Sequence, residues 1–334
     1  MKNRDGRPIK LEGNPQHPLS RGGLCAAGQA SLLGLYDGRR LKSPLRDGVA
    51  STWAAVDAAM GEQLAALKKS RGAVRFLSGT LHSPTAKAVV QRFLADFSDA
   101  HQVVYDALSN SAILDAHELT HGVRVLPRYQ FEQAEVVVSF DADFLGTWIS
   151  PVEYTAGYRQ ARQNASAAQR PPFHAQFEAR YSITGAKADR RVRVNPADMG
   201  LLMSHLAALV GERAGKQLVR AADLTACPAP TEVLRDVADR LWGARGRGLV
   251  VCGVQDVQQQ VLCNYLNHAL GNYGRVLDLE SPSQQRQGSD AALADLLKEL
   301  EAGSVAALFI CDANPVFDLP NGTALTEAIK KVPL

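Results

Sequence analysis

Short apolar runs alternate with helical segments along most of this chain, and this alternation most constrains its fold. Each run is apolar almost throughout and is followed by a turn and then a helix, which is typical of parallel strands covered on both faces. The sequence therefore predicts an α/β fold with two Rossmann-like parallel-sheet units. The expected strands lie at 73–79, 101–106, 134–143, 173–184, 190–196, 247–254, 274–280 and 305–315.

The pattern also suggests where the units divide. Residues 1–47 carry Gly, Pro and Asn every few positions, which predicts an N-terminal segment of turns and short strands. We expect a first α/β unit over 48–220, opening with an alanine-rich helix near 50–69, and a second over 221–334. A polar surface loop is expected at 162–172.

Composition narrows the class of protein. The 334 residues are 46% hydrophobic and 21% charged, with a net charge of +3, which fits a globular protein and gives no support for a nucleic-acid partner. No apolar run approaches the roughly 18 residues needed to span a membrane. The polar N-terminus MKNRDGRPIKLEG does not resemble a signal peptide.

The expected strand ends are rich in small residues, amides and carboxylates. Ligands of open α/β sheets bind at these ends, and such residues suit a nucleotide, although they also form ordinary turns and helix caps. Neither G-x-G-x-x-G nor G-x-x-x-x-G-K-[ST] occurs, which disfavours a nicotinamide dehydrogenase or an ATPase. The ends read LSGT (77–80), YDALSNS (105–111), SFDADFLG (139–146), ITGAKAD (183–189), CGVQD (252–256) and CDANPVFDLPNG (311–322).

Five dispersed cysteines and one histidine pair are candidates for special chemistry. The cysteines form no C-x-x-C pair, so a disulfide framework is not expected, and Cys252 and Cys311 are interpreted as small buried side chains. His117 and His121 lie in HELTH, which matches a zinc-protease string. Their helix is short and ends at Gly122, so surface or capping roles are favoured over zinc.

One longer string resembles a known family. Residues 6–45, GRPIKLEGNPQHPLSRGGLCAAGQASLLGLYDGRRLKSPL, are similar to the N-terminal part of molybdopterin oxidoreductases, just after their iron–sulfur cysteines. The resemblance points to the catalytically degenerate branch, the molybdopterin-like subunits of respiratory complexes such as alternative complex III and menaquinone reductase. Further similar stretches lie at 134–151, 179–196, 268–274 and 305–320.

The resemblance suggests a role for Cys25. It matches the last ligand of a [4Fe–4S] cluster, but residues 1–24 contain no other cysteine, and such a cluster needs about four thiolates. Cys25 is therefore a metal ligand only if cysteines precede it in a longer chain; otherwise it is a remnant. The resemblance also implies that this is a fragment, without the family's upstream iron–sulfur region and C-terminal barrel.

Other positions depart from the catalytic pattern. The Asp-Pro-Arg run that follows one strand in many dinucleotide-binding members is replaced by ARYSITG, and neither Ser109 nor Ser111 stands out as a molybdenum ligand rather than a helix cap. No catalytic residue is assigned. By resemblance, the candidate cofactor-pocket positions, functional or vestigial, are Ser78, Gly79, Asp141, Asp143, Thr184, Gly185, Gly253, Asn272, Asp312 and Asn314; turns and packing are the alternative.

The function expected from this resemblance is a non-catalytic scaffold in a quinone-linked respiratory complex. Its partners would be an iron–sulfur subunit or domain and a quinone-interacting membrane subunit. No cofactor is expected in this chain, although molybdopterin guanine dinucleotide and [4Fe–4S] belong to the family. The alternative is a truncated molybdenum enzyme. Membrane association through partners on the periplasmic side of a bacterium is expected, or the cytoplasm if no twin-arginine signal precedes the chain.

Overall fold

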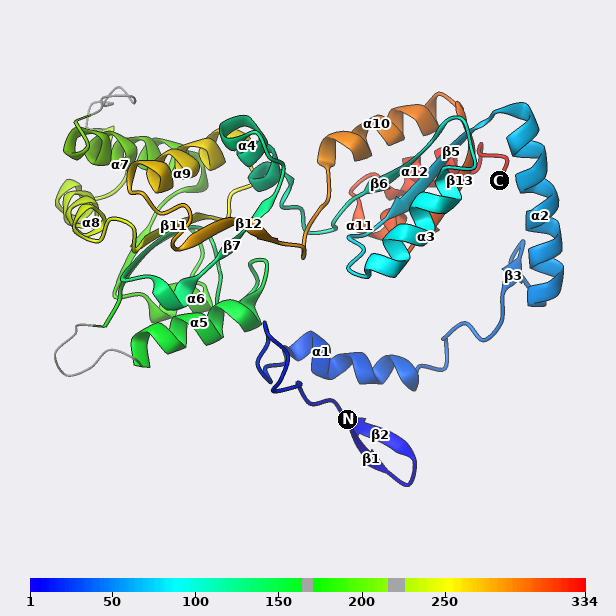
Figure 1. Cartoon of the computed structure of the whole chain (residues 1–334), viewed down its shortest axis with the longest axis horizontal. Helices are drawn as coiled ribbons and strands as arrows, with labels where there is room; N and C mark the ends of the chain where they lie inside the picture. The colour runs from blue at the N-terminus through cyan, green and yellow to red at the C-terminus, as the bar shows by residue number, and fades with distance from the viewer. Residues whose placement is uncertain (164–170, 216–225) are drawn as a thin grey trace. The chain divides into compact units, whose positions relative to one another are not determined.

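The computed structural model describes residues 1–163, 171–215 and 226–334. They form two units, and neither unit is continuous in sequence (Figure 1). Unit 1 contains Met1–Leu32 and Ala112–Ser283, and unit 2 contains Leu33–Ser111 and Gln284–Leu334. This division differs from the linear one at residues 47 and 220, because strands distant in sequence pair with each other. The loop expected at 162–172 falls largely outside the described residues.

A four-stranded parallel sheet organises unit 1, in the order β10-β9-β8-β11. Alternate side chains of the central strands enter two hydrophobic cores, because successive side chains of a strand point to opposite faces. Val138 and Phe140 join the core that contains α7, α8 and α9, whereas Val137 joins the core that contains α5. Helices α7 and α9 lie on one side of the sheet and α5 on the other (Figure 1). The elements are β8 (Val136–Phe140), β9 (Phe173–Glu178), β10 (Arg190–Arg193), β11 (Gly248–Cys252), α5 (Pro151–Gln163), α6 (Ile183–Lys187), α7 (Met199–Arg213), α8 (Thr231–Gly243) and α9 (Val257–Ala269).

Two further strands of unit 1 lie outside the parallel sheet. The sequence predicts a strand at 274–280, and the structure has β12 at Leu277–Ser283, paired antiparallel with β7 at Leu126–Tyr129. The helix before β7 is α4, Ser111–His121. Leu126 and Leu277 bury into the same core as α5, so this small sheet extends the cover of one face.

Unit 2 has a three-stranded parallel sheet, in the order β13-β5-β6. Helix α10 packs Leu293, Leu296 and Leu300 with Leu77 of β5, and α3 packs Val90 and Leu94 into a second core. The strands are β5 (Ala73–Ser78), β6 (Ala100–Val104) and β13 (Val305–Cys311), and the helices are α2 (Trp53–Ser70), α3 (Pro84–Leu94), α10 (Asp290–Glu301), α11 (Pro315–Asp318) and α12 (Gly322–Ile329). Together, the parallel sheets of the two units confirm the predicted α/β fold.

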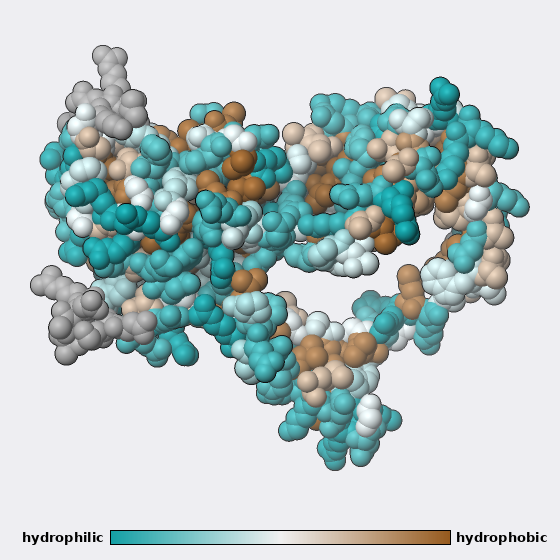
Figure 2. Space-filling model, in the orientation of Figure 1, coloured by the Kyte–Doolittle hydropathy of each residue, from teal (hydrophilic) through white to brown (hydrophobic). Residues whose placement is uncertain are grey.

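The N-terminal region consists of short elements. Its parts are the hairpin β1 (Lys2–Arg4) and β2 (Arg7–Lys10), α1 (Ala26–Ala30), the 3-10 turn Ser31–Leu35, and the hairpin β3 (Leu45–Arg46) and β4 (Val49–Ala50). Figure 2 shows hydrophobic side chains over α1 and the turn after it, where Leu33 is 71% exposed. In the part of the chain that the structure describes, no helix has the length and apolarity to cross a membrane.

Candidate functional site

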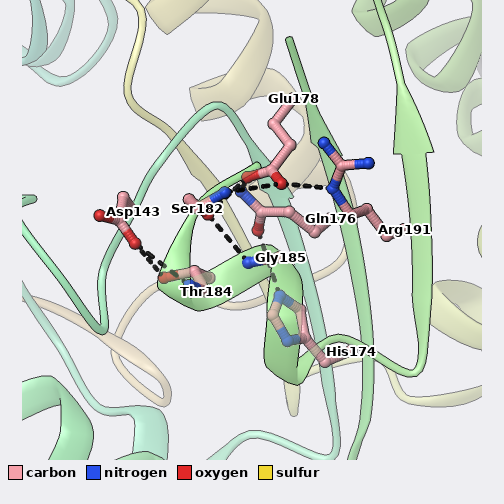
Figure 3. Close-up of polar contacts among 8 residues, drawn as sticks. All are labelled: Asp143, His174, Gln176, Glu178, Ser182, Thr184, Gly185 and Arg191. Carbon is pink, nitrogen blue, oxygen red and sulfur yellow. Dashed lines mark hydrogen bonds and ion pairs between the residues drawn. The ribbon is translucent and has the colours of Figure 1, made fainter. Parts of the chain in front are cut away.

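Strand β9 of unit 1 has a polar face as well as an apolar one. His174, Gln176 and Glu178 alternate along it and are all at most 1% exposed (Figure 3). Ala175 and Phe177, between them, belong to the hydrophobic core on the other side. The His174 ring lies 3.2 Å from the Gln176 amide oxygen, and the Gln176 amide donates to Glu178 at 3.2 Å. A buried polar row of this kind ends at the carboxyl edge of the sheet, where ligands of α/β folds bind.

Glu178 is surrounded by donors from its own chain. Its carboxylate accepts from the Ser182 hydroxyl at 2.5 Å, the Ser182 N–H at 3.2 Å and the Arg191 guanidinium at 2.6 Å. Burial raises the pKa of Glu178, but the hydrogen bonds from Ser182 and Arg191 outweigh burial and hold the pKa below its usual value. Glu178 is therefore a buried carboxylate in its charged form, held between the start of α6 and β10.

Gly185 lies directly against this carboxylate. Ser182 caps α6 by accepting from the Gly185 N–H at 2.9 Å. A Cβ atom on Gly185 would lie 1.9 Å from Glu178 Oε1, so no larger residue fits while the carboxylate stays in place. The need for glycine at position 185 is thus explained by the close approach of the Glu178 side chain.

Asp143 follows β8 and joins the same end of the sheet to α6. Its Oδ1 accepts from the Thr184 hydroxyl at 2.8 Å and the Thr184 N–H at 3.1 Å, and its Oδ2 from the Thr147 hydroxyl at 3.3 Å. The Thr184 hydroxyl in turn accepts from the Leu145 N–H at 2.9 Å. Asp143 is 8% exposed, so its oxygens are largely committed to these partners.

Asp141 and Gly253 meet where β8 and β11 end. Asp141 has the left-handed φ of 52°, and a Cβ on Gly253 would lie 2.4 Å from the Asp141 carbonyl oxygen. Burial raises the pKa of Asp141, against the opposing effect of Arg180. Asp141, Asp143, Thr184, Gly185 and Gly253 are therefore brought together at one edge, as the strand-end argument predicts.

Asn272 lies elsewhere in unit 1. It follows α9, which runs back from the end of β11, and the Leu270 carbonyl accepts from Gly246, just before β11 begins. Asn272 is fully buried, its amide donates to Asn267 at 2.9 Å, and its backbone carbonyl accepts from Val276 at 3.0 Å. It closes a turn at the amino edge of the sheet and is not grouped with the other candidates.

Four candidates belong to unit 2, at the carboxyl ends of its strands. Ser78, the last residue of β5, accepts from the Gln102 amide at 2.8 Å, and a Cβ on Gly79 would lie 3.3 Å from the Asp312 carbonyl oxygen. Asn314 caps α11 by accepting from the Phe317 N–H at 3.3 Å. These residues form a second cluster, in which the side chains of Ser78 and Asn314 are engaged in packing and capping.

Cys25 lines a groove of about 770 Å³ in unit 1. It is exposed and caps α1, its sulfur accepting from the Gly28 N–H at 3.4 Å. The groove is lined by Ser20, Arg21, Gly22, Gly23, Leu24, Cys25, Ala26, Leu145, Gly146, Pro151, Val152, Thr155, Ala156, Arg159, Gln160, Gln163 and Ile183. Gly146 and Ile183 lie close to Asp143 and Thr184 in sequence, so the groove adjoins the candidate site.

The two cofactors of the family that the chain resembles need different ligands. A [4Fe–4S] cluster needs about four thiolates, and the described residues contain no group of three or more His, Cys, Asp or Glu placed to hold a metal. The described residues therefore do not fit the cluster. A pterin dinucleotide would need polar groups that are free to bind it, and the carboxylates of Asp143 and Glu178 already accept from several internal donors.

The structure confirms some of the roles expected from sequence and corrects others. Cys252 is buried as predicted, but Cys311 is exposed, because it ends an edge strand whose last two residues are uncovered. Ser109 accepts from the Ser111 N–H at 3.0 Å, which agrees with capping. His117 is buried rather than on the surface, with its ring nitrogens 2.7 Å from the Ile113 carbonyl and 3.2 Å from the Tyr273 hydroxyl.

Glu178, Arg191, Ser182, His174 and Gln176 were missed by the sequence reasoning. The signal was present in FHAQFE, where polar residues take every second position of a strand whose other face is apolar. Alternation normally indicates a solvated face. Only the packing of α5 and α6, with the Tyr158 hydroxyl 3.3 Å from the His174 ring, shows that this polar face is enclosed.

Three comparisons relate the chain to known proteins. No family model matches it. It is 24% identical over 368 residues to the menaquinone reductase molybdopterin-binding-like subunit of Nitratidesulfovibrio vulgaris, covering 98% of this chain and 52% of that protein. A 43-residue stretch, 13% of this chain and 4% of the relative, is 44% identical to a sulfite dehydrogenase subunit of Allochromatium vinosum.

The fold is also found in a solved structure. Acetylene hydratase from Pelobacter acetylenicus superposes with a TM-score of 0.72 at 10% identity, covering 95% of this chain and 55% of that one. At this identity the likeness concerns the fold alone. This chain thus spans about half the length of the long curated relative and of the solved structure.

Proposed function

We propose that this chain, which belongs to the molybdopterin oxidoreductase-like proteins, is a non-catalytic scaffold in a quinone-linked respiratory complex. The proposal draws its class from the menaquinone reductase subunit, whose name describes it as molybdopterin-binding-like. The chain would hold an iron–sulfur electron-transfer subunit or domain, and electrons would pass through that partner. A quinone-interacting membrane subunit would complete the assembly.

One observation carries the non-catalytic part of the proposal. Glu178 fills the space against Gly185, and its carboxylate is held by Ser182, Gln176 and Arg191. A ligand group entering there would have to displace a buried, charged side chain from its partners, and leaving such a charge unpaired costs several kcal/mol. The candidate pocket is better explained as a closed internal network than as an open binding site.

The same proposal covers partners and location. The protein would be bacterial and membrane-associated through its partner subunits, on the periplasmic side of the membrane. Its role would be to provide a docking surface for these partners, and it would bind no cofactor itself.

The experiment that tests this proposal is the metal and pterin content of the purified protein. Elemental analysis for molybdenum, tungsten and iron is combined with the fluorescence of acid-released pterin, on this chain and on any longer native chain that contains it. Less than about a tenth of an equivalent of molybdenum, tungsten and pterin is expected in both samples, and less than about a tenth of an equivalent of iron in this chain. Near-stoichiometric pterin with molybdenum or tungsten in either sample would instead identify a catalytic molybdenum enzyme.

A further inference from the structure

We propose that the groove lined by Cys25 binds an extended acidic segment of a partner protein. This inference deepens the proposed scaffold role and rests on it in one respect, namely that a partner exists. The inference is tested by peptide binding, whereas the scaffold role is tested by metal and pterin content. A negative result in one experiment therefore does not decide the other.

The shape of the groove suits an extended chain. One wall is the outer face of α5, whose lining residues recur with helical spacing from Val152 through Ala156 and Arg159 to Gln163. At 1.5 Å per residue this face is roughly 16 Å long. An extended peptide advances about 3.3 Å per residue, so about five residues fit along it.

Residues 20–26, which also line the groove, contact α5 near the two ends of the helix. The Arg21 guanidinium donates to the Gln160 amide oxygen at 2.9 Å, and a Cβ on Gly23 would lie 2.6 Å from Val152 Cγ1. The backbone of residues 20–26 thus lies close along the helix. A bound segment would enter a preformed groove, which lowers the ordering cost of binding.

The charge of the groove selects an acidic occupant. Arg21 and Arg159 line it, and its described lining contains no Asp or Glu. These two arginines are the only charged side chains of that lining, and the carboxylates of the adjoining site, Asp143 and Glu178, are buried and held by internal donors. Complementary charge favours and orients an acidic partner.

Apolar side chains distinguish a protein segment from a small anion. Leu24, Leu145, Val152 and Ile183 also line the groove, and Ile183 is 62% exposed. A phosphate or other small anion would leave these apolar groups in water, whereas a segment with alternating acidic and apolar residues would cover them. The observations thus favour a peptide in which carboxylates meet the arginines and apolar side chains meet Ile183 and Val152.

The binding test uses a labelled model peptide, fluorescein-Glu-Leu-Glu-Leu-Glu-amide, and fluorescence anisotropy with the full chain. We expect saturable binding that weakens about tenfold in Arg159→Gln, because the loss of one charge-assisted contact corresponds to about that factor. Arg235→Gln, an exposed arginine of α8 outside the groove, is the matched control and should bind as wild type. The lysine counterpart of the peptide should not bind.

A second readout locates the peptide on the wild-type protein. Cys25 and Cys311 are both exposed, but only Cys25 lines the groove. Saturating peptide should slow maleimide labelling of Cys25 several-fold, measured by mass spectrometry, and leave Cys311 unchanged. Equal binding by Arg159→Gln, unprotected Cys25, or equal protection of Cys25 by inorganic pyrophosphate alone would overturn the proposal, the last by identifying a small-anion site.

Discussion

The hydroxyl and the backbone N–H of Thr184 donate to the same oxygen of Asp143, at 2.8 and 3.1 Å. Asp143 lies in the loop after β8, and Thr184 in the first turn of α6. Both side chains are buried. This pair therefore holds two segments of unit 1 together at the edge of the sheet where the candidate site lies.

Replacing Asp143 should destabilise unit 1. Asp143→Ala leaves the buried Thr184 donors without an acceptor, and we expect a loss of about 2–3 kcal/mol in the free energy of unfolding. Asp143→Asn keeps one carbonyl oxygen and should lose about 1 kcal/mol. Urea unfolding followed by circular dichroism measures both. If Asp143→Ala were as stable as the wild type, the hydrogen bonds between Asp143 and Thr184 would not stabilise unit 1.

Gly253→Ala should be strongly destabilising. Its Cβ would lie 2.4 Å from the Asp141 carbonyl oxygen and 2.9 Å from Ala142 Cα, both backbone atoms that cannot rotate away. Overpacking of this kind costs about 1–3 kcal/mol. Gly243→Ala at the end of α8 is the control, since no atom lies within 4 Å of its Cβ, and it should be neutral or slightly stabilising. Matching thermal midpoints for the two variants would contradict the close approach of the two strand ends.

His174 should make stability depend on pH. Burial lowers the pKa of His174 to about 4, with Gln176, Asp189, Arg162 and Glu178 as its charged and polar neighbours. Because its folded pKa lies below the unfolded value of about 6.5, the neutral ring favours folding above pH 6.5, and this contribution is lost as pH falls towards 4. The loss is about 2 kcal/mol at pH 5.

The test compares urea unfolding at pH 7.5 and pH 5. His174→Gln should reduce the difference between the two pH values by about 2 kcal/mol. A residual difference should remain, because burial also lowers the pKa of His117 to about 4. An unchanged pH difference in His174→Gln would mean that the ring is protonated inside the folded protein.

Replacing Arg75 should lower the stability of unit 2. It is 5% exposed, and its guanidinium donates to both carboxylate oxygens of Glu299, at 2.7 and 3.0 Å, and to Asp99 at 2.9 Å. Arg75→Lys keeps the charge but cannot form the two-pronged contact, and we expect a loss of about 2 kcal/mol by urea unfolding. Arg92→Lys, on the exposed side of α3, should leave the midpoint unchanged. A midpoint unaltered by Arg75→Lys would mean that charge alone suffices.

The sequence was informative about strands that are buried on both faces. VVVSF of β8 and GLVVC of β11 are buried throughout, and such runs identify parallel strands that are covered on both faces. The strand β7, LPRY, was not predicted, because it is short and contains a proline and an arginine. Strand order was not predictable either, because pairing such as β11 with β8 depends on how helices cover the sheet rather than on either strand alone.

The candidate site was found in part for a comparable reason. Asp143, Thr184 and Gly185 follow strands and carry the residue types expected at a sheet edge. Glu178 and Arg191 look like ordinary strand residues until α6 folds over them. Asn272 was included by resemblance alone, and the sequence does not show that the chain has already returned to the amino edge of the sheet at this point.

The discontinuity of the units bears on how the protein is made. The residues assigned to unit 1 precede Gln284, so the ribosome makes this part of unit 1 before α10 and β13 of unit 2, and it can fold during synthesis. Unit 2 begins at Leu33 but needs β13 and α10, which come after unit 1. While the ribosome translates roughly the next 170 residues, the edge of β5 that later pairs with β13 therefore stays unpaired. A chaperone that shields a strand edge would act on this segment of the nascent chain.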